Sequence, residues 1–127
     1  MPRVVQFEVP ADDPERAARF YKSVFGWGIE KWNGPMEYWM VTTGPEGEMG
    51  INGGIMRRTG QADGGSPTAY VCTVDVDALD RYVAKVETNG GTIVAPKMAV
   101  PGIGWMAYCK DTEGNQFGLM QPDEKAA

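Results

Sequence analysis

Histidine is absent from the sequence, and cysteine is rare. Without histidine the chain cannot contain a Ser-His-Asp triad, the two-histidine facial triad that binds iron, or the usual catalytic zinc site. The two cysteines, Cys72 and Cys109, lie far apart in different apolar runs, so we expect free thiols and no disulfide framework. Most hydrolase and metalloenzyme templates are therefore excluded.

Long hydrophobic runs and basic clusters are also missing. No apolar stretch approaches the roughly 20 residues that span a bilayer, and the first residues lack the apolar segment of a secretory signal. Twelve Lys and Arg stand against seventeen Asp and Glu, which leaves a net charge of -5. No run of basic residues could follow a phosphate backbone. We therefore expect a cytoplasmic protein that binds neither membranes nor nucleic acid.

The composition that is present is that of an ordinary globular protein. The 127 residues are 43% hydrophobic and 23% charged, close to the averages for soluble folded domains. This length fits one domain, or two small halves that share a core.

The second half of the chain repeats landmarks of the first. Sliding the sequence against itself aligns four pairs of identical residues: Asp13 with Asp77, Gly26 with Gly90, Gly54 with Gly118, and Met56 with Met120. Each half then predicts one strand, one helix and three strands. We expect a first module over residues 1–56, a linker over 57–67, a second module over 68–122 and a tail over 123–127.

The first module begins with a strand over residues 4–9 and a helix that starts at Asp13 and Pro14, a capping residue and a favoured first position. The helix is expected to end near Gly26 and to bury one apolar stripe, consisting of Ala17, Phe20, Tyr21, Val24 and Phe25. Strands are expected over residues 27–32, 37–43 and 50–56.

The predicted linker is polar and rich in glycine, which is typical of a surface segment. Its first residues, Arg57 and Arg58, either bind an anion or are simply solvated, and we favour the latter. The second module is expected to contain a strand over 69–76, a helix capped by Asp77, and strands over 92–100, 104–110 and 116–121. The apolar face of that helix is predicted to consist of Leu79, Tyr82, Val83 and Val86.

Three segments carry a resemblance to a known family. They are residues 7–21 (FEVPADDPERAARFY) together with residues 25–27 (FGW), residues 100–108 (VPGIGWMAY), and residues 111–121 (DTEGNQFGLMQ). Together with the repeat, they resemble the vicinal oxygen chelate superfamily of glyoxalases, bleomycin-resistance proteins and extradiol dioxygenases, and in particular a small bacterial glyoxalase-like subgroup. The resemblance implies an α+β fold in which two βαβββ modules form a curled eight-stranded cup. It also implies a homodimer.

Active members of that superfamily bind a divalent metal with side chains from the first and last strands of each half. The resemblance places the first-strand ligands on Gln6 and on Tyr70 or a neighbour, and the last-strand acids on Gly54 and Gly118. Glycine has no side-chain oxygen, and Glu8 beside Gln6 would supply only one carboxylate. We therefore expect no metal and no cofactor.

A cup without metal can still bind a small molecule. Four Trp, five Tyr, four Phe and eight Met favour an adaptable apolar pocket, although each of them could instead fill the core. Strand alternation gives as candidate ligand-binding residues Gln6, Asn52, Gly54, Tyr70, Cys72, Gly118 and Met120. The aromatic residues Tyr38, Trp39, Trp105 and Tyr108 are candidate walls of the same pocket.

Two functions remain open from the sequence. The first is binding or sequestration of a small apolar or aromatic compound, for which the net negative charge is compatible with a cationic ligand. The alternative is a metal-free or atypical-metal glyoxalase-like lyase or isomerase that acts on a carbonyl compound, with Glu8 as the catalytic base. Burial would raise the pKa of Glu8 for that role, whereas a solvent-facing Glu8 would have none. Cys72 lacks a histidine to activate it as a nucleophile. A degenerate scaffold in a larger assembly is a third alternative.

Overall fold

The computed structural model describes residues 2–58 and 69–127. These fall into two compact units, which we call the first unit (residues 6–71) and the second unit (residues 1–5 and 72–127). Most of the predicted linker lies outside the described residues. No helix in the described ranges is both long enough and apolar enough to cross a membrane.

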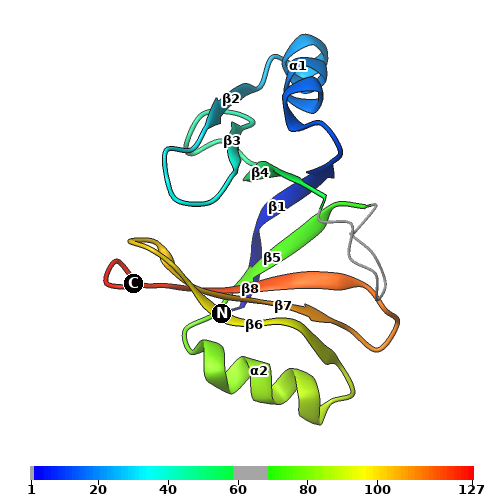
Figure 1. Ribbon diagram of the computed structural model, residues 1–127, viewed down its shortest axis with the longest axis vertical. Coiled ribbons are helices and arrows are strands. Elements are labelled where there is room, and N and C mark those ends of the chain that lie inside the picture. The colour runs from blue at the N-terminus through cyan, green and yellow to red at the C-terminus, as the bar shows by residue number, and fades with distance from the viewer. Residues whose placement is uncertain (1, 59–68) are drawn as a thin grey trace. The chain divides into compact units, whose positions relative to one another are not determined.

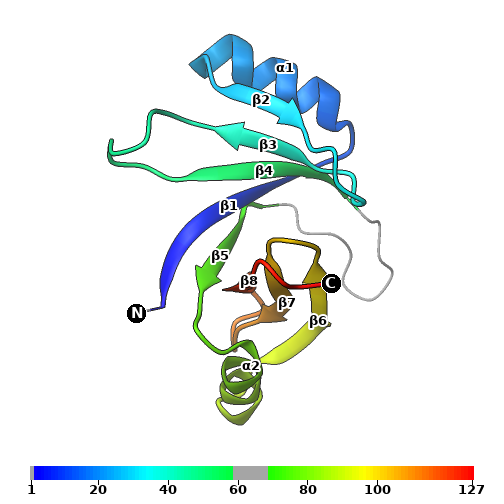
Figure 2. The ribbon, with the colours of Figure 1, turned by 90° about the vertical axis from the view of Figure 1, so that its left-hand side faces the viewer.

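The first unit follows the predicted order of one strand, one helix and three strands (Figures 1 and 2). Its elements are β1 (Arg3–Ala11, of which residues 6–11 lie in this unit), α1 (Pro14–Phe25), β2 (Gly28–Lys31), β3 (Trp39–Thr42) and β4 (Asn52–Arg57). The strands pair in the order β2-β3-β4-β1, and β1 runs parallel to β4 while the other pairs are antiparallel. The α1 helix packs against β2 and β4.

Helix α1 begins and ends as the sequence predicts. The Asp13 side chain accepts a hydrogen bond of 3.1 Å from the backbone N–H of Arg16, and Pro14 is the first helical residue. At the other end, Gly26 adopts a left-handed conformation with φ of 72°, and its N–H donates to the carbonyl of Lys22 at 2.9 Å. Both ends are therefore satisfied by local residues.

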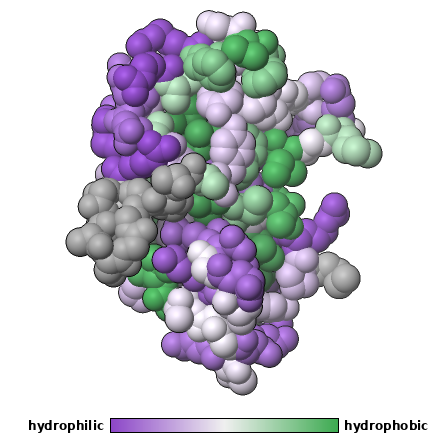
Figure 3. All heavy atoms as spheres, turned by 90° about the vertical axis from the view of Figure 1, so that its right-hand side faces the viewer, coloured by the Kyte–Doolittle hydropathy of each residue, from purple (hydrophilic) through white to green (hydrophobic). Residues whose placement is uncertain are grey.

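The prediction that the whole apolar stripe of α1 is core is wrong. Phe20, Val24 and Phe25 are 53 to 60% exposed. Ala17 and Tyr21 do pack against the core, together with the buried Ala18, which lies outside the predicted stripe. Hydrophobic atoms accordingly reach the surface in the upper part of Figure 3, where α1 lies. The exposed Phe25 stacks on Trp27, with ring centroids 5.2 Å apart. Tyr21 also stacks on Trp27 at 5.2 Å between centroids, and both of these rings pack against the core as well.

The core of the first unit lies between α1 and one face of the sheet. Its buried residues alternate along the strands and comprise Phe7, Val9, Ala11, Ala18, Ile29, Trp39, Val41 and Ile55. Because successive side chains of a strand point to opposite faces, the residues between them belong to the other face. We call this the helix-free face, and its members in the first unit include Gln6, Glu8, Glu30, Tyr38, Met40, Asn52, Gly54 and Met56.

The second unit repeats the plan with β5 (Val71–Asp75), α2 (Leu79–Thr88), β6 (Thr92–Val100), β7 (Gly104–Lys110) and β8 (Gln116–Pro122), where Val71 itself is counted with the first unit. The strands pair in the order β5-β8-β7-β6, and β5 runs parallel to β8. Helix α2 lies along this sheet (Figure 1) and covers a core of Val76, Leu79, Ala107, Cys109 and Leu119. The predicted pair of βαβββ modules is therefore confirmed.

The predicted cap of the second helix is wrong. Helix α2 starts at Leu79, and the capping position is occupied by Ala78, which offers no side-chain bond. Asp77 instead pairs with Arg81 at 2.8 Å. The N–H of Leu79 donates at 2.8 Å to the side-chain oxygen of Gln121, a residue of β8. Because Leu79 is fully buried, its N–H needs an acceptor within the protein, and the distant Gln121 supplies it in place of the predicted Asp77.

Candidate binding site at a strand glycine

Gly54 lies at the centre of the helix-free face of the first unit. It pairs with Glu8 of β1 on one side and with Met40 of β3 on the other. The ring of Tyr38, the residue before β3, lies directly over it. A Cβ at position 54 would overlap the ring and hydroxyl of Tyr38. The phenol therefore fills the space that a larger residue would need.

Three polar side chains meet at this glycine, and we call Gln6, Glu8 and Tyr38 the polar trio. Nε2 of Gln6 donates to the hydroxyl oxygen of Tyr38 at 2.6 Å. Glu8 is only 4% exposed, so the alternative of a solvent-facing Glu8 is wrong. Burial, followed by the negative charge of Glu8, raises the pKa of Tyr38 above its ordinary value, and a hydrogen bond with Glu8 acts in the same direction. The phenol therefore keeps its proton.

Apolar and acidic side chains surround the polar trio on the same face. Met40 is 43% exposed, and Met56 is half-buried. Glu30 pairs with Met40 across β2 and β3 and adds an exposed carboxylate. Asn52 is also exposed, and its side-chain oxygen accepts a bond of 2.9 Å from the backbone N–H of Thr43. The face thus combines flexible apolar surface with negative charge.

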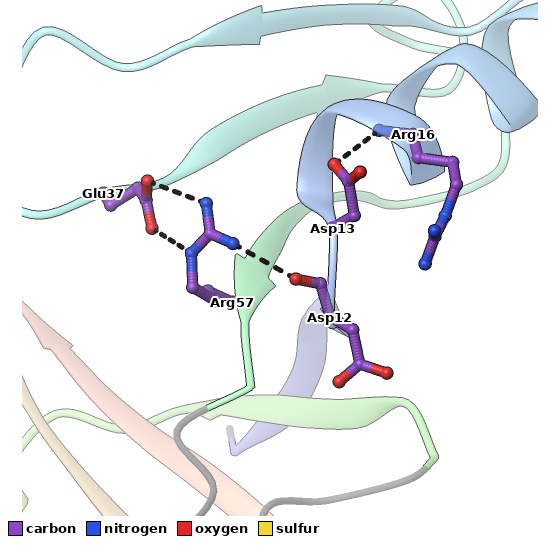
Figure 4. Close-up of polar contacts among 5 residues, drawn as sticks. All are labelled: Asp12, Asp13, Arg16, Glu37 and Arg57. Atoms are coloured by element: carbon purple, nitrogen blue, oxygen red, sulfur yellow. Dashed lines mark hydrogen bonds and ion pairs between the residues drawn. The ribbon is translucent and has the colours of Figure 1, made fainter.

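Arg57 belongs to β4 and not to a linker, which corrects the sequence interpretation. Its guanidinium donates to both carboxylate oxygens of Glu37, at 2.9 and 3.2 Å, and to the backbone carbonyl of Asp12 at 3.1 Å (Figure 4). The next residue, Arg58, forms an ion pair of 2.9 Å with the Asp12 carboxylate. The hydrogen bond and charge of Arg57 lower the pKa of Glu37.

Sequence reasoning missed the Arg57–Glu37 pair, although a signal was present. Trp39 pairs with Ile55 in the antiparallel β3–β4 ladder. Continuing that register by two residues places Glu37 opposite Arg57, and opposite charges commonly face one another across strands. Assigning Arg57 to a linker concealed this match.

The second unit surrounds the matching glycine differently. Gly118 pairs with Thr73 of β5 and with Tyr108 of β7. A Cβ there would lie 3.1 Å from the Thr73 hydroxyl and 3.4 Å from the Tyr108 ring, which is tight but not an overlap. Thr73 is 1% exposed, and its hydroxyl has no hydrogen-bond partner among the residues that the structure describes. Met120, also predicted for the pocket, is half-buried on the same face.

Three predicted pocket residues lie on the face of their sheet that points away from the glycine. Trp39 is 6% exposed in the core beneath α1. Trp105 packs against the core beneath α2, and its indole N–H donates to Asp123 at 3.0 Å. Cys72 is exposed and alternates with the buried Thr73 along β5, so it also faces away from Gly118.

Tyr70 does not join the polar trio either. Its ring stacks on Phe7 with centroids 5.7 Å apart, on the α1 side of the sheet. Its hydroxyl shares a hydrogen bond of 2.7 Å with the hydroxyl of Tyr21. The β1 and β5 registers, in which Glu8 and Thr73 occupy matching positions, make Val71 the counterpart of Gln6.

The residues present do not fit a divalent metal. Among the described residues, no group of three or more His, Cys, Asp or Glu side chains is placed to hold one. The space above Gly54 is filled by a protonated phenol, and Thr73 and Tyr108 close in on Gly118. What the first unit offers instead is a hydrogen-bonding carboxylate, amide and phenol.

Comparison with curated sequences finds similar proteins over most of the chain. A family model for the bleomycin resistance protein-like N-terminal region matches residues 3–44. A glyoxylase-like domain-containing protein of Didymella fabae is 30% identical over 116 residues, which cover 88% of either chain. The anthracycline biosynthesis protein DauV of Streptomyces sp. (strain C5) is 30% identical over 125 residues, covering 89% of this chain. Only 44% of DauV is covered, so this chain spans less than half of its length.

Solved structures share the fold at low sequence identity. The methylmalonyl-CoA epimerase of Mycobacterium tuberculosis superimposes with a TM-score of 0.64 at 12% identity, over 94% of this chain and 87% of that one. A hypothetical protein of Bacillus halodurans gives the same TM-score at 9% identity, over 99% and 98% of the two chains. These likenesses show the fold alone.

Proposed function

Because the chain belongs to the vicinal oxygen chelate superfamily of glyoxalase-like proteins, we propose that it binds a small apolar or aromatic molecule on the helix-free face of its first unit. The observation that carries the proposal is the polar trio at Gly54, in which Glu8 is buried and Gln6 and Tyr38 are half-buried. Ligand sites typically combine apolar surface with a few placed polar groups, and the Tyr38 ring and Met40 supply the apolar part.

Stability of the fold alone does not account for the polar trio. Burying a carboxylate costs free energy even when it is hydrogen-bonded, and the matching position of the second unit holds the neutral Thr73. The same backbone plan therefore does not require Glu8. A buried polar group that the fold does not need supports a role in binding.

The charges on this face favour a ligand with a cationic or hydrogen-bond-donating group. Glu8 and the exposed Glu30 both contribute negative charge, and the whole chain carries -5. The flexible Met40 side chain suits flat ligands of varied outline. The matched family is named for bleomycin resistance and DauV for anthracycline biosynthesis, and both names concern small molecules.

A dye-binding experiment tests the proposal. The wild type is titrated with cationic proflavine, neutral Nile red and anionic anilinonaphthalene sulfonate, and binding is followed by fluorescence. We expect proflavine to bind best, and Glu8→Gln to weaken its binding about tenfold because the binding face loses a negative charge. Glu48→Gln, which removes the same charge from an exposed turn, is the matched control. Absence of binding by all three dyes would refute the proposal.

A native mass spectrum of gently purified protein supplies an independent test. A mass adduct of a few hundred daltons that is lost on denaturation would identify the class of natural ligand. The same spectrum reports whether the protein is the homodimer that family resemblance implies, and whether a metal is bound.

One observation favours a second candidate, a metal-free glyoxalase-like lyase or isomerase. The Glu8 carboxylate and the protonated Tyr38 hydroxyl are adjacent, which gives a base and a proton donor at one place. Such an enzyme would exchange the proton next to the carbonyl group of its substrate. Deuterium exchange into a panel of ketoaldehydes in D2O, followed by NMR, checks this, and equal exchange by Glu8→Gln would exclude Glu8 as the base.

A further inference from the structure

The Arg57–Glu37 pair lies one residue away from the polar trio but on the other face of the sheet. Consecutive residues of an extended chain point to opposite faces, so Glu37 points toward Arg57 while Tyr38 points toward Gly54. A contact that fixes Glu37 on one face therefore also fixes the direction of Tyr38 on the other.

Arg57 is itself held in place. Besides both oxygens of Glu37, its guanidinium bonds to the carbonyl of Asp12 in the β1–α1 turn (Figure 4). A planar guanidinium that binds a carboxylate through two parallel bonds restricts both partners more than a single contact does. The pair thus ties the start of β3 to the ends of β4 and β1.

On its other side, Tyr38 is secured by one backbone bond. Its carbonyl accepts a hydrogen bond of 2.8 Å from the N–H of Trp32, which closes the loop between β2 and β3. Within that loop the Trp32 ring packs against Gly34, where a Cβ would overlap it. The loop and the ion pair together define where the phenol can sit.

We propose that Arg57 and Glu37 are positioning residues for the binding face, because their ion pair holds the Tyr38 phenol over Gly54. There the phenol oxygen accepts a hydrogen bond from Gln6. This inference rests on the proposed function only in its effect on ligand binding; the seating of Tyr38 can be tested without a ligand. Arg57 and Glu37 are 51% and 43% exposed. Salt therefore screens their attraction, and the position of the Tyr38 phenol becomes less restricted as ionic strength rises.

The test follows Tyr38 directly by NMR of protein labelled with 13C at the phenol carbon of tyrosine. Tyr38→Phe assigns the signal. In the wild type we expect the Tyr38 signal to resist alkaline titration beyond the ordinary tyrosine range near pH 10. In Arg57→Met the signal should shift and titrate closer to that range, and the Trp32 amide should exchange with solvent about fivefold faster.

Arg58→Met is the matched control, because it removes the same charge from the next residue, whose ion pair is with the Asp12 carboxylate. It should leave the Tyr38 signal unchanged. Exchanging the charges in the double variant Arg57→Glu, Glu37→Arg should restore part of the wild-type signal. An unmoved Tyr38 signal in Arg57→Met would overturn the inference.

Three further measurements distinguish a local change at Tyr38 from general unfolding. Glu37→Gln keeps a polar acceptor and should shift the signal less than Arg57→Met does. The amides of Val41 and Ile55, which lie in the core, should remain protected in every variant. In the wild type, 1 M NaCl should reproduce the direction of the Arg57→Met shift, and the same salt should add little to that variant.

Proflavine affinity tests whether the position of the Tyr38 phenol affects ligand binding. We expect its affinity to fall about fivefold in Arg57→Met and to stay unchanged in Arg58→Met. Equal affinity in both variants with a moved Tyr38 signal would overturn the effect on binding. If proflavine, Nile red and anilinonaphthalene sulfonate all fail to bind the wild type, the proposed function fails. The Tyr38 signal still decides whether the ion pair holds the phenol over Gly54.

Discussion

The two units each place a glycine at the matching position of corresponding strands, β4 and β8, and surround it with different side chains. Next to Gly54 lies the buried Glu8, and next to Gly118 lies the buried Thr73. In the first unit the phenol of Tyr38 accepts a hydrogen bond over the glycine, whereas the Thr73 hydroxyl has no partner in the described part of the chain. The shared plan of strands thus fixes where a site can stand, and a few side chains decide whether it is charged.

This difference predicts that a methyl group added at each glycine has unequal effects. Gly54→Ala forces the Tyr38 ring away and should destabilise the protein by up to about 3 kcal/mol, as overpacking does. Gly118→Ala meets only tight contacts and should cost less than about 1 kcal/mol, because alanine also suits a strand better than glycine. Urea unfolding measures both. Equal costs would mean that Tyr38 does not lie over Gly54.

Removing one hydroxyl from each unit should act in opposite directions. Tyr38→Phe leaves the Gln6 amide without its acceptor and should cost about 2 kcal/mol. Thr73→Val removes a buried hydroxyl that has no partner within the described ranges, and should stabilise the protein by about 1 kcal/mol. The free energies of unfolding of the two variants check this. A loss of stability in Thr73→Val as large as that in Tyr38→Phe would contradict the comparison.

Alkaline pH should weaken the first unit through its tyrosines. Burial raises the pKa of Tyr38 in the folded state, and burial together with Tyr21 raises the pKa of Tyr70 to about 12. Above pH 10 the unfolded chain loses these protons while the folded chain keeps them, so stability falls as pH rises. For Tyr38 the slope reaches about 1.4 kcal/mol per pH unit. Urea unfolding of the wild type and of Tyr38→Phe at pH 9 and 11 should show a smaller loss of stability in the variant. Equal losses in the two proteins would contradict a raised pKa for Tyr38.

The smallest contrast concerns the two aspartates that the repeat aligns. Asp13→Ala removes the cap of α1 and should cost about 1 kcal/mol. Asp77→Ala removes only an exposed pair with Arg81 and should cost less than about 0.5 kcal/mol. Thermal unfolding of both variants checks the order. If Asp77→Ala proved the more damaging, the assignment of the α2 cap to Gln121 would fail.

Elements encoded by local signals could be predicted from the sequence. Asp13, Pro14 and Gly26 lie within or next to α1, so its bounds followed from neighbouring residues. The strands β6 and β7 have the predicted bounds, because turn residues flank them on both sides. The start of α2 could not be predicted, since it depends on Gln121, which approaches only after the sheet has formed.

The candidate site could be predicted only as far as strand alternation reaches. Gln6, Glu8 and Gly54 were assigned to one face, and the structure brings them together. Tyr38 and Trp39 were both expected to line a pocket, yet neighbouring residues of a strand face opposite ways, and the sequence does not say which one faces the core. Trp39 does, because its large apolar ring fills the space beneath α1.

The second half of the repeat shows the same difficulty in its register. Aligning identical residues matched Asp13 to Asp77, but the helix of the second unit starts one residue later than this match requires. The same shift makes Thr73, and not Cys72, the counterpart of Glu8. A single residue of register decides which side chain faces the glycine, and identities alone do not fix it.

The bond from Leu79 to Gln121 has a consequence for the order in which the two helices mature. Helix α1 carries both of its caps within its own segment, so its ends are complete once Gly26 has been synthesised. The first turn of α2 waits for a residue 42 positions further along the chain. Contacts of such long range form late in folding because a large loop must close first. During synthesis α1 can therefore form early, whereas the first turn of α2 remains frayed until β8 has been synthesised and has joined the sheet.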